Sequence, residues 1–130
     1  TLVAHLLLGR NEVVILDMEA GVEHLGRATA QAVDKLIVVV EPGQRSLEVA
    51  QKIRQLAGDI GLKSIGLVGN KVRGEGDREF LQQRMPDLSF LGFIAYDPRV
   101  VEADLSGTPP YEGNPEFLKS LEEIVDRLMP

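Results

Sequence analysis

The sequence contains no cysteine and only two histidines, His5 and His24. Disulfide bonds and thiolate metal sites within these 130 residues are therefore excluded, and the two histidines cannot form a metal site by themselves. The chain also lacks a basic run, because 14 Lys and Arg face 20 Asp and Glu for a formal net charge of −6. Since phosphate contacts supply most of the affinity of nucleic-acid-binding proteins, this balance argues against DNA or RNA as a partner.

Long apolar runs are missing as well. No run approaches the roughly 18 to 20 residues that a membrane-spanning helix needs, and no secretory signal opens the chain. We therefore expect a cytoplasmic protein with no membrane partner. Hydrophobic residues make up 44% of the chain and charged residues 26%, a composition typical of a folded globular domain.

Short apolar runs recur along the chain and alternate with helix-like patterns. Four of these runs are apolar on both faces, which indicates buried strands of a parallel sheet. They cover residues 13–16, 36–40, 65–68 and 90–94. Residues 1–9 have the pattern expected for the end of an earlier helix.

Helix start signals lie between the apolar runs. Ser46 and Asp77 are each expected to cap a following helix, and Gly61 is expected to end the first of these helices. Asp97-Pro98 and Asn114-Pro115 each place an N-cap residue before a proline at the first helical position. The last helix is expected to bury an apolar stripe made of Phe117, Leu121, Ile124, Val125 and Leu128.

This alternation predicts an α/β fold, a three-layer doubly wound mostly parallel sheet with right-handed crossovers. In such sheets, ligands bind outside the carboxyl ends of the strands. Polar or glycine residues follow all four predicted strands, and we expect them to converge on one edge of the sheet. They are Asp17 with Gly21, Glu41 with Pro42, Asn70 with Lys71, and Asp97.

The segment 13–26, VVILDMEAGVEHLG, brings a carboxylate to a strand end and a glycine four residues later. Asp17 can hold Mg²⁺ directly or through water, and the backbone N–H of Gly21 can approach a terminal phosphate. Asp-x-x-x-Gly alone is a weak motif, and the plain alternative is a strand end followed by a turn. Glu19 and Glu23 bracket the glycine, either as solvated loop charges or as groups that orient water or contact a partner.

The segment 65–72, IGLVGNKV, brings an amide to the end of another strand. The side chain of Asn70 offers both a donor and an acceptor to the edge of a nucleobase, although asparagine also begins turns often. Asp97 is explained by helix capping, and a second duty near a nucleobase stays open.

Taken in order, these segments resemble the MinD/ParA branch of P-loop ATPases, over residues 5–128. Within that branch, the stretch 13–42, VVILDMEAGVEHLGRATAQAVDKLIVVVEP, is most similar to the CooC-type accessory proteins of carbon monoxide dehydrogenase. The resemblance implies an ATPase that uses ATP and Mg²⁺ and works as a homodimer. For CooC-type members, it implies nickel insertion into carbon monoxide dehydrogenase, which would be the client enzyme.

The resemblance also implies roles for individual residues. Asp17 would be the Walker B aspartate that acts on Mg²⁺, and Gly21 would be the switch II glycine that senses the γ-phosphate. Glu19 and Glu23 would belong to switch II. Adenine would be contacted by Asn70 and Lys71 and flanked from the next strand end by Ala95, Tyr96 and Asp97.

One departure from the family pattern limits these expectations. The pattern Gly-x-x-x-x-Gly-Lys-[Ser/Thr], which supplies most of the phosphate grip, is absent from the 130 residues. Residues 1–130 are therefore expected to be the C-terminal part of a single MinD/CooC-like nucleotide-binding domain that lacks the N-terminal P-loop strand. We expect this chain to bind ATP/ADP poorly and to hydrolyse none. Any nickel ligands are expected upstream, and exposed strand edges are expected to pair with another copy.

Three alternatives stay open. Another MinD/ParA-type ATPase, for partition or metallocluster assembly, would share the fold, although the acidic residues of segment 115–130 argue against a membrane-docking helix. A response-regulator receiver domain would use Asp17 to accept a phosphoryl group, but the acidic pair and the later Thr or Ser and Lys of that class are missing. In a non-catalytic α/β interaction domain, Asp17 and Asn70 would only be turn residues.

Overall fold

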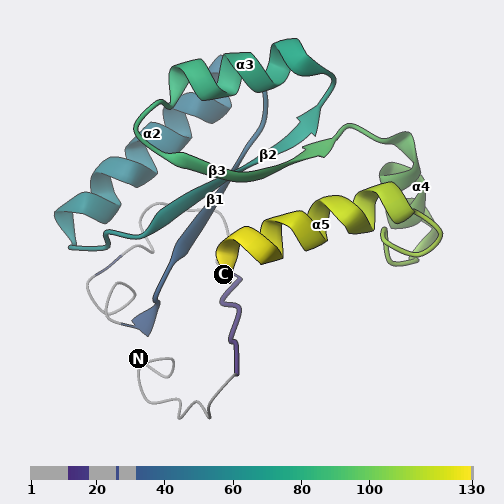
Figure 1. Ribbon diagram of the computed structural model, residues 1–130, viewed down its shortest axis with the longest axis horizontal. Helices are drawn as coiled ribbons and strands as arrows, with labels where there is room; N and C mark the ends of the chain where they lie inside the picture. The colour runs from purple at the N-terminus through teal and green to yellow at the C-terminus, as the bar shows by residue number, and fades with distance from the viewer. Residues whose placement is uncertain (1–11, 18–25, 27–31, 130) are drawn as a thin grey trace.

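The computed structural model describes residues 12–17, 26 and 32–129 of the chain (Figure 1). Its core is a three-stranded parallel sheet in the order β1-β2-β3. In chain order the elements are β1 (Leu36–Val40), α2 (Gln44–Asp59), β2 (Ile65–Val72), α3 (Glu75–Arg84), β3 (Ser89–Ala95), α4 (Pro98–Ser106) and α5 (Pro115–Leu128). Every strand is followed by a helix, as a parallel sheet requires.

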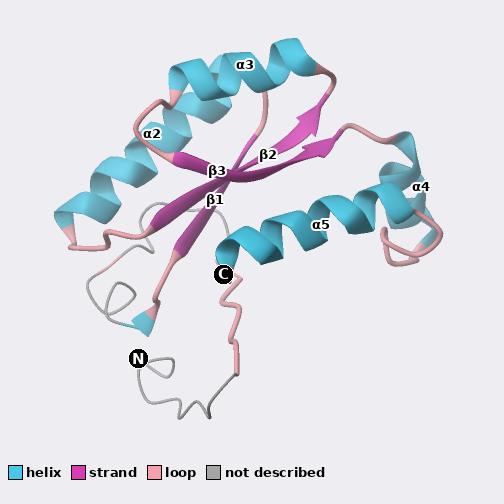
Figure 2. Cartoon of the chain, in the orientation of Figure 1, coloured by secondary structure: helices cyan, strands magenta, loops and turns pink. Residues whose placement is uncertain are grey.

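Helices cover both faces of the sheet, which gives the expected three layers (Figures 1 and 2). On one face, α2 and α3 pack on the strands through a cluster of buried side chains: Val38, Val40, Leu47, Ala50, Leu67, Val72, Leu81 and Met85. On the other face, α5 packs on β3 and buries Ile124 against Val68 and Leu91. The α/β architecture predicted from the sequence is therefore confirmed.

Gly92 of β3 allows α5 to approach the sheet closely. A Cβ atom at this position would lie 2.6 Å from Cγ1 of Ile124, well inside van der Waals contact. The absence of a side chain at Gly92 thus sets how close helix and strand can come.

The strands agree with the sequence prediction at three of the four apolar runs. β1 has the predicted bounds, β3 extends the predicted run by one residue at each end, and β2 continues to Val72, well beyond residue 68. The prediction for residues 13–16 is wrong, because these residues form no strand and their side chains are 41–87% exposed. An apolar run becomes a strand only where another strand satisfies its backbone groups, and residues 13–16 have no such neighbour in the described part of the chain.

Two of the four predicted N-caps are confirmed. Asp97 caps α4 and Asn114 caps α5, each followed by proline at the first helical position. Ser46 and Asp77 are not N-caps, because α2 and α3 begin earlier, after Gly43 and Gly74. Both side chains sit in the first turn of their helix and accept a 2.9 Å hydrogen bond from a backbone N–H that precedes it, on Glu41 and on Arg73. Each is the third residue of its helix and reaches back to a backbone N–H before the helix, as the third helical residue of a capping box does. The sequence signal for a helix start therefore lies inside the first turn and not before it.

The ends and faces of the helices agree in part. α2 ends at Asp59, and Gly61 follows with a left-handed φ of 86°, as a glycine stop predicts. In α5, Ile124 is buried and Phe117, Leu121 and Leu128 are partly buried, but Val125 is 50% exposed, contrary to expectation. The reason is that α5 rests on the sheet along one flank only.

The helix expected at residues 1–9 lies outside the described residues. Among the helices that the structure describes, none is long and apolar enough to cross a membrane.

Candidate functional site

The carboxyl end of β2 contains an irregularity centred on Asn70 and Lys71. The register between β2 and β3 shifts between Gly69 and Val72, so these two residues leave the regular ladder. Lys71 has a φ of 55°, a left-handed conformation that costs a residue with a side chain about 1–2 kcal/mol. Asn70 therefore lies within a bulged strand, near the strand end where the sequence placed it, and the alternative that it begins a turn is wrong. Bulges of this kind re-aim side chains and are frequent beside binding sites.

The Asn70 side chain is half-buried, and its amide makes no hydrogen bond to the part of the chain that the structure describes. Beside it, Lys71 Nζ forms an ion pair with Glu41 Oε1 at 3.0 Å, which joins the end of β1 to the bulge of β2. Both charged side chains are about half exposed, so this pair contributes little to stability. The Asn70 amide is therefore one group at this edge that is free to bind a ligand.

The segment after β3 forms the neighbouring wall. The backbone N–H of Tyr96 donates to Val72 O at 2.9 Å and extends the ladder past the bulge. The Arg73 guanidinium lies over the Tyr96 ring, 4.9 Å from its centre. A shallow hollow of about 400 Å³ opens here, lined by Val72, Arg73, Gly74, Arg78, Ala95 and Tyr96. It is an open, basic surface with one aromatic face.

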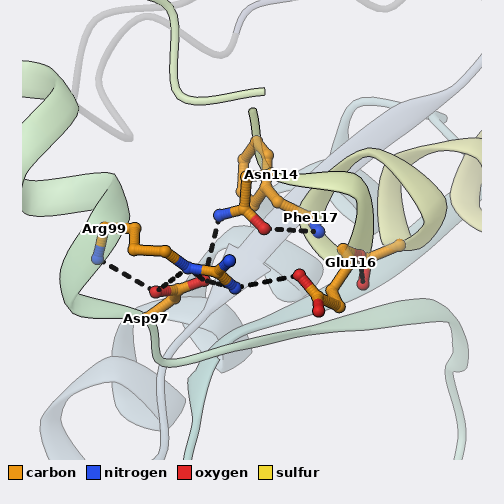
Figure 3. A network of polar contacts seen from close by, with 6 residues as sticks. Asp97, Arg99, Asn114, Glu116 and Phe117 are labelled. Carbon is orange, nitrogen blue, oxygen red and sulfur yellow. Dashed lines mark hydrogen bonds and ion pairs between the residues drawn. The ribbon is translucent and has the colours of Figure 1, made fainter. Parts of the chain in front are cut away.

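Beyond Tyr96, a hydrogen-bonded network fixes the entry to α4 (Figure 3). The Asp97 carboxylate accepts hydrogen bonds from the backbone N–H of Arg99 at 2.9 Å, from Arg99 Nε at 3.1 Å and from Arg99 Nη2 at 2.8 Å. It also accepts a 2.9 Å hydrogen bond from Asn114 Nδ2. Arg99 Nη2 continues to Glu116 Oε2 at 2.9 Å, so the start of α4 is tied to the start of α5.

The network also sets the charge state of its members. Hydrogen bonds from Arg99 and then from Asn114 hold the pKa of Asp97 well below its ordinary value. The hydrogen bond from Arg99 likewise lowers the pKa of Glu116. Both oxygens of Asp97 accept hydrogen bonds within the protein, so this carboxylate holds the loop 95–97 in position. Asn114 is 3% exposed and is the buried polar residue at the centre of the network in the described part of the chain.

The sequence predicted only part of this network. Asp97 and Asn114 were identified as caps, and their capping is confirmed, but their hydrogen bond to each other and the roles of Arg99 and Glu116 were missed. A signal was present, because Asp97-Pro-Arg and Asn114-Pro-Glu repeat the same cap with opposite charges at the second helical position. Two such caps can pair only if the fold brings both helix starts together, which a linear pattern does not reveal.

The phosphate side of the predicted site is not assembled among the described residues. Asp17 is exposed, ends the segment without strand structure, and makes no hydrogen bond or ion pair within the described residues. The convergence of Asp17 with the other strand ends stays a prediction. Glu19, Gly21 and Glu23 lie outside the described residues. In the described ranges, no group of three or more His, Asp or Glu side chains could hold a metal ion.

Comparison with known proteins identifies relatives over most of the chain. No protein-family model matches it. The chain is 44% identical to the carbon monoxide dehydrogenase accessory protein CooC of Rhodospirillum rubrum over 115 residues, which is 88% of this chain and 44% of that protein. It is 46% identical to an uncharacterised ATP-binding protein of Methanocaldococcus jannaschii over 111 residues, 83% of this chain and 43% of that protein. The chain thus spans less than half the length of the curated relatives it matches.

The solved structures agree on the fold. The MinD cell division protein of Aquifex aeolicus superposes with a TM-score of 0.64 at 20% identity, over 78% of this chain and 46% of that chain. The parallel sheet with helices on both faces is therefore a MinD-like arrangement. With the sequence relationship to CooC and to ATP-binding proteins, the fold shows that this chain belongs to the MinD/ParA-type P-loop ATPases.

Proposed function

We propose that this chain forms the adenine-binding edge of a CooC-like ATPase. The observation that carries the proposal is the bulge at Asn70 and Lys71. The half-buried Asn70 amide in this bulge has no hydrogen-bond partner among the described residues. It lies beside the loop 95–97, which the Asp97 network holds in position. A strained backbone conformation is costly, and such conformations concentrate at binding sites. The relatives support the same assignment, since one is named an ATP-binding protein and another CooC.

The chemistry of this edge suits a purine base. The Asn70 amide offers a donor and an acceptor, the combination that pairs in two places with the edge of adenine. Tyr96 and the guanidinium stacked on it supply a flat, polarisable wall, and Ala95 leaves space beside it. Asp97 holds this wall in position through Arg99 and Asn114.

The same proposal assigns Mg²⁺ and phosphate to the segment 17–23. A carboxylate such as Asp17 is the ligand type that Mg²⁺ prefers, and Gly21 would approach the γ-phosphate between Glu19 and Glu23. The fit is incomplete, because the 130 residues contain no Gly-x-x-x-x-Gly-Lys-[Ser/Thr] loop and Asp17 is exposed, with no hydrogen bond or ion pair to the described residues. The chain by itself is therefore expected to bind Mg-ATP weakly and to hydrolyse none.

The relationship to CooC extends the proposal to the complete protein. We assign to it a cytoplasmic homodimer that uses ATP hydrolysis to assist nickel insertion into carbon monoxide dehydrogenase. Nickel would be its cargo; the sequence contains no cysteine, and the described residues include no group of three or more His, Asp or Glu side chains that could hold a metal ion. The nickel ligands of the proposal therefore belong to another part of the protein.

The base site can be tested on this chain with adenosine, which needs no phosphate loop. In an NMR titration, we expect millimolar binding that shifts the backbone amides of Asn70, Lys71 and Tyr96. Asn70→Ala should abolish these shifts, and guanosine should produce weaker ones. Gln83→Ala, which removes an exposed amide from α3, is the matched control and should change nothing. Absent or diffuse shifts would reject the base site and favour the non-catalytic interaction domain.

A calorimetric titration of Mg-ATP into the chain tests separately whether the chain binds the phosphates without a phosphate-binding loop. Heats too small to fit are expected. Micromolar affinity that Asp17→Ala and Asn70→Ala abolish would show that the chain builds a complete nucleotide site without a P-loop.

A further inference from the structure

Glu41 lies next to Asn70 at the carboxyl edge of the sheet. The register between β1 and β2 ends with Val40 opposite Gly69, so Glu41 and Asn70 are the next residues along the two strands. Neighbouring strands of a sheet lie about 4.8 Å apart. A ligand bound at Asn70 is therefore within reach of Glu41 if it extends toward β1.

Two contacts hold Glu41 in this place. Its backbone N–H donates to Ser46 Oγ, in the first turn of α2, at 2.9 Å. Its Oε1 forms the 3.0 Å ion pair with Lys71 Nζ. The other oxygen, Oε2, makes no hydrogen bond or ion pair to the part of the chain that the structure describes. Since a carboxylate has about four lone-pair sites, Glu41 keeps acceptor capacity for a ligand.

The ion pair also connects Glu41 to the bulge of β2. Lys71 takes its left-handed conformation, with a φ of 55°, and its side chain reaches Glu41 at the end of the neighbouring strand. An ion pair between two half-exposed side chains contributes little to stability, so it does not offset the strain of this conformation. Strain that stability does not explain is typical of binding sites. The pair instead fixes the direction of the Glu41 carboxylate, which makes Lys71 a positioning residue.

The wall on the β3 side sets the direction in which a nucleoside extends along this edge. The Tyr96 ring and the loop 95–97 form that wall, and the Asp97 network holds the loop in place. Because β2 lies between β3 and β1, a ligand that starts at the wall and follows the edge passes Asn70 and then Glu41 (Figure 1). A ribose is joined to its base by a single bond and has two adjacent hydroxyls that can donate hydrogen bonds. A carboxylate beside a base site is the matching acceptor for these hydroxyls.

We infer that Glu41 accepts hydrogen bonds from the ribose hydroxyls of the nucleotide whose base binds at Asn70, and that Lys71 orients Glu41 for this contact. The inference rests on the proposed function and deepens it, because it makes the site selective for nucleotides that carry these hydroxyls. Dinucleotide-binding α/β folds use a carboxylate in the same way, with an Asp or Glu that binds the ribose 2′-hydroxyl.

The experiment is an NMR titration of the chain with adenosine 5′-monophosphate (AMP) and with 2′,3′-dideoxy-AMP, which differ only in the two hydroxyls. The phosphate is common to both ligands, so its electrostatic effect cancels in the ratio of their dissociation constants. We expect AMP to bind about ten-fold more tightly, because the dideoxy analogue loses hydrogen bonds to a charged group. The backbone amide signals of Glu41 and Asn70 should both shift with AMP.

Matched variants assign the preference to single side chains. Glu41→Ala should bring the two dissociation constants together, whereas Glu48→Ala, which removes an exposed carboxylate from α2, should leave their ratio unchanged. Lys71→Met breaks the ion pair and should lower the ratio, and Lys71→Arg keeps a cation and should retain it. A merely structural role of Lys71 would change the affinity for both nucleotides equally. Glu41 and Lys71 are half exposed, so these variants should fold, and their amide spectra check that they do.

Two results would overturn the inference and leave the base site intact. The first is equal affinity for the two nucleotides, with shifts that Asn70→Ala abolishes. The second is a preference for AMP that Glu41→Ala retains. Shifts that persist in Asn70→Ala, or the absence of any shift, would reject the base site and the inference together.

Discussion

Asp97 and Asn114 are the N-cap residues of two different helices, and they are hydrogen-bonded to each other, with Asn114 Nδ2 donating to Asp97 Oδ2 at 2.9 Å. Each also keeps its own cap: Asp97 accepts from the N–H of Arg99, and Asn114 accepts from the N–H of Phe117. The amide of Asn114 thus serves two helices, one with its oxygen and one with its nitrogen. This pair fixes the loop 95–97 that forms one wall of the proposed base site.

Truncating Asn114 should therefore lower the free energy of unfolding by more than the loss of one helix cap does. Asn114→Ala removes the cap of α5 and the hydrogen bond to Asp97 from a site that is 3% exposed. We expect the free energy of unfolding to fall by about 2 to 3 kcal/mol in a urea titration. Gln82→Ala, at an exposed position of α3, should stay within about 0.5 kcal/mol of the parent. An effect of Asn114→Ala no larger than that of the control would mean that the two caps are not coupled.

Stability should depend on acid through the same network. Because the pKa values of Asp97 and Glu116 are lower in the folded chain than in the unfolded chain, their charged forms stabilise the fold above the unfolded pKa, about 4. That contribution is lost as the pH falls through the folded pKa. We expect the Tm to decline below about pH 4, and Asp97→Asn to be less stable at pH 7 and to decline less steeply.

Calorimetry at a series of pH values from neutral to acidic measures this difference. Asp104→Asn, which changes an exposed carboxylate on α4 outside the network, should follow the parent curve. Parallel curves for the parent and Asp97→Asn would contradict the pKa argument.

Gly92→Ala tests the close contact between β3 and α5. The new Cβ would meet Cγ1 of Ile124 at 2.6 Å, so helix or strand must shift. Overpacking of this kind typically costs about 1–3 kcal/mol. Ile124→Ala removes the opposing atom, so the double variant should be more stable than the sum of the two single changes predicts. Additive losses in urea unfolding would show that the contact does not limit the packing.

Lys71 tests whether the bulge of β2 is strained. Lys71→Gly removes the side chain that disfavours a φ of 55°, and the ion pair lost with it is weak, so we expect stability to rise by about 0.5 to 1 kcal/mol. Lys71→Val should be destabilising, because a β-branched side chain tolerates this conformation poorly. Equal midpoints of urea unfolding for the two variants would argue against stored strain. The adenosine titration on Lys71→Gly then shows whether the strained bulge is needed for binding.

The sequence predicted the elements well where local signals and tertiary structure agree. The runs at 36–40 and 90–94 became strands because each has a neighbour to pair with, and the Asp97-Pro and Asn114-Pro caps acted through contacts within a few residues. Predictions failed where the outcome depends on distant partners. Residues 13–16 have strand composition but no adjacent strand, and Val125 has core composition but no helix beside it in the described structure.

The candidate site shows the same division. Asn70 and Asp97 were found from their position after apolar runs, since strand ends are marked in the sequence. The left-handed conformation of Lys71 was not predictable, because lysine gives no signal for it. The pairing of Asn114 with Asp97 spans seventeen positions and follows from how β3 and α5 pack.

The network around Asp97 also gives α4 an unusual status within the domain. α4 buries no residue of its own, and its amino end is tied to the start of α5 by Asp97 and Arg99. Asp97 and Asn114 therefore act as a clasp at the base of a protruding segment that contributes little to the core. A segment held at its base in this way should tolerate insertions. A peptide or a fluorescent reporter inserted between Ser106 and Gly113 should leave the packing of the sheet and α5 unchanged, as long as the hydrogen bond between Asp97 and Asn114 is kept.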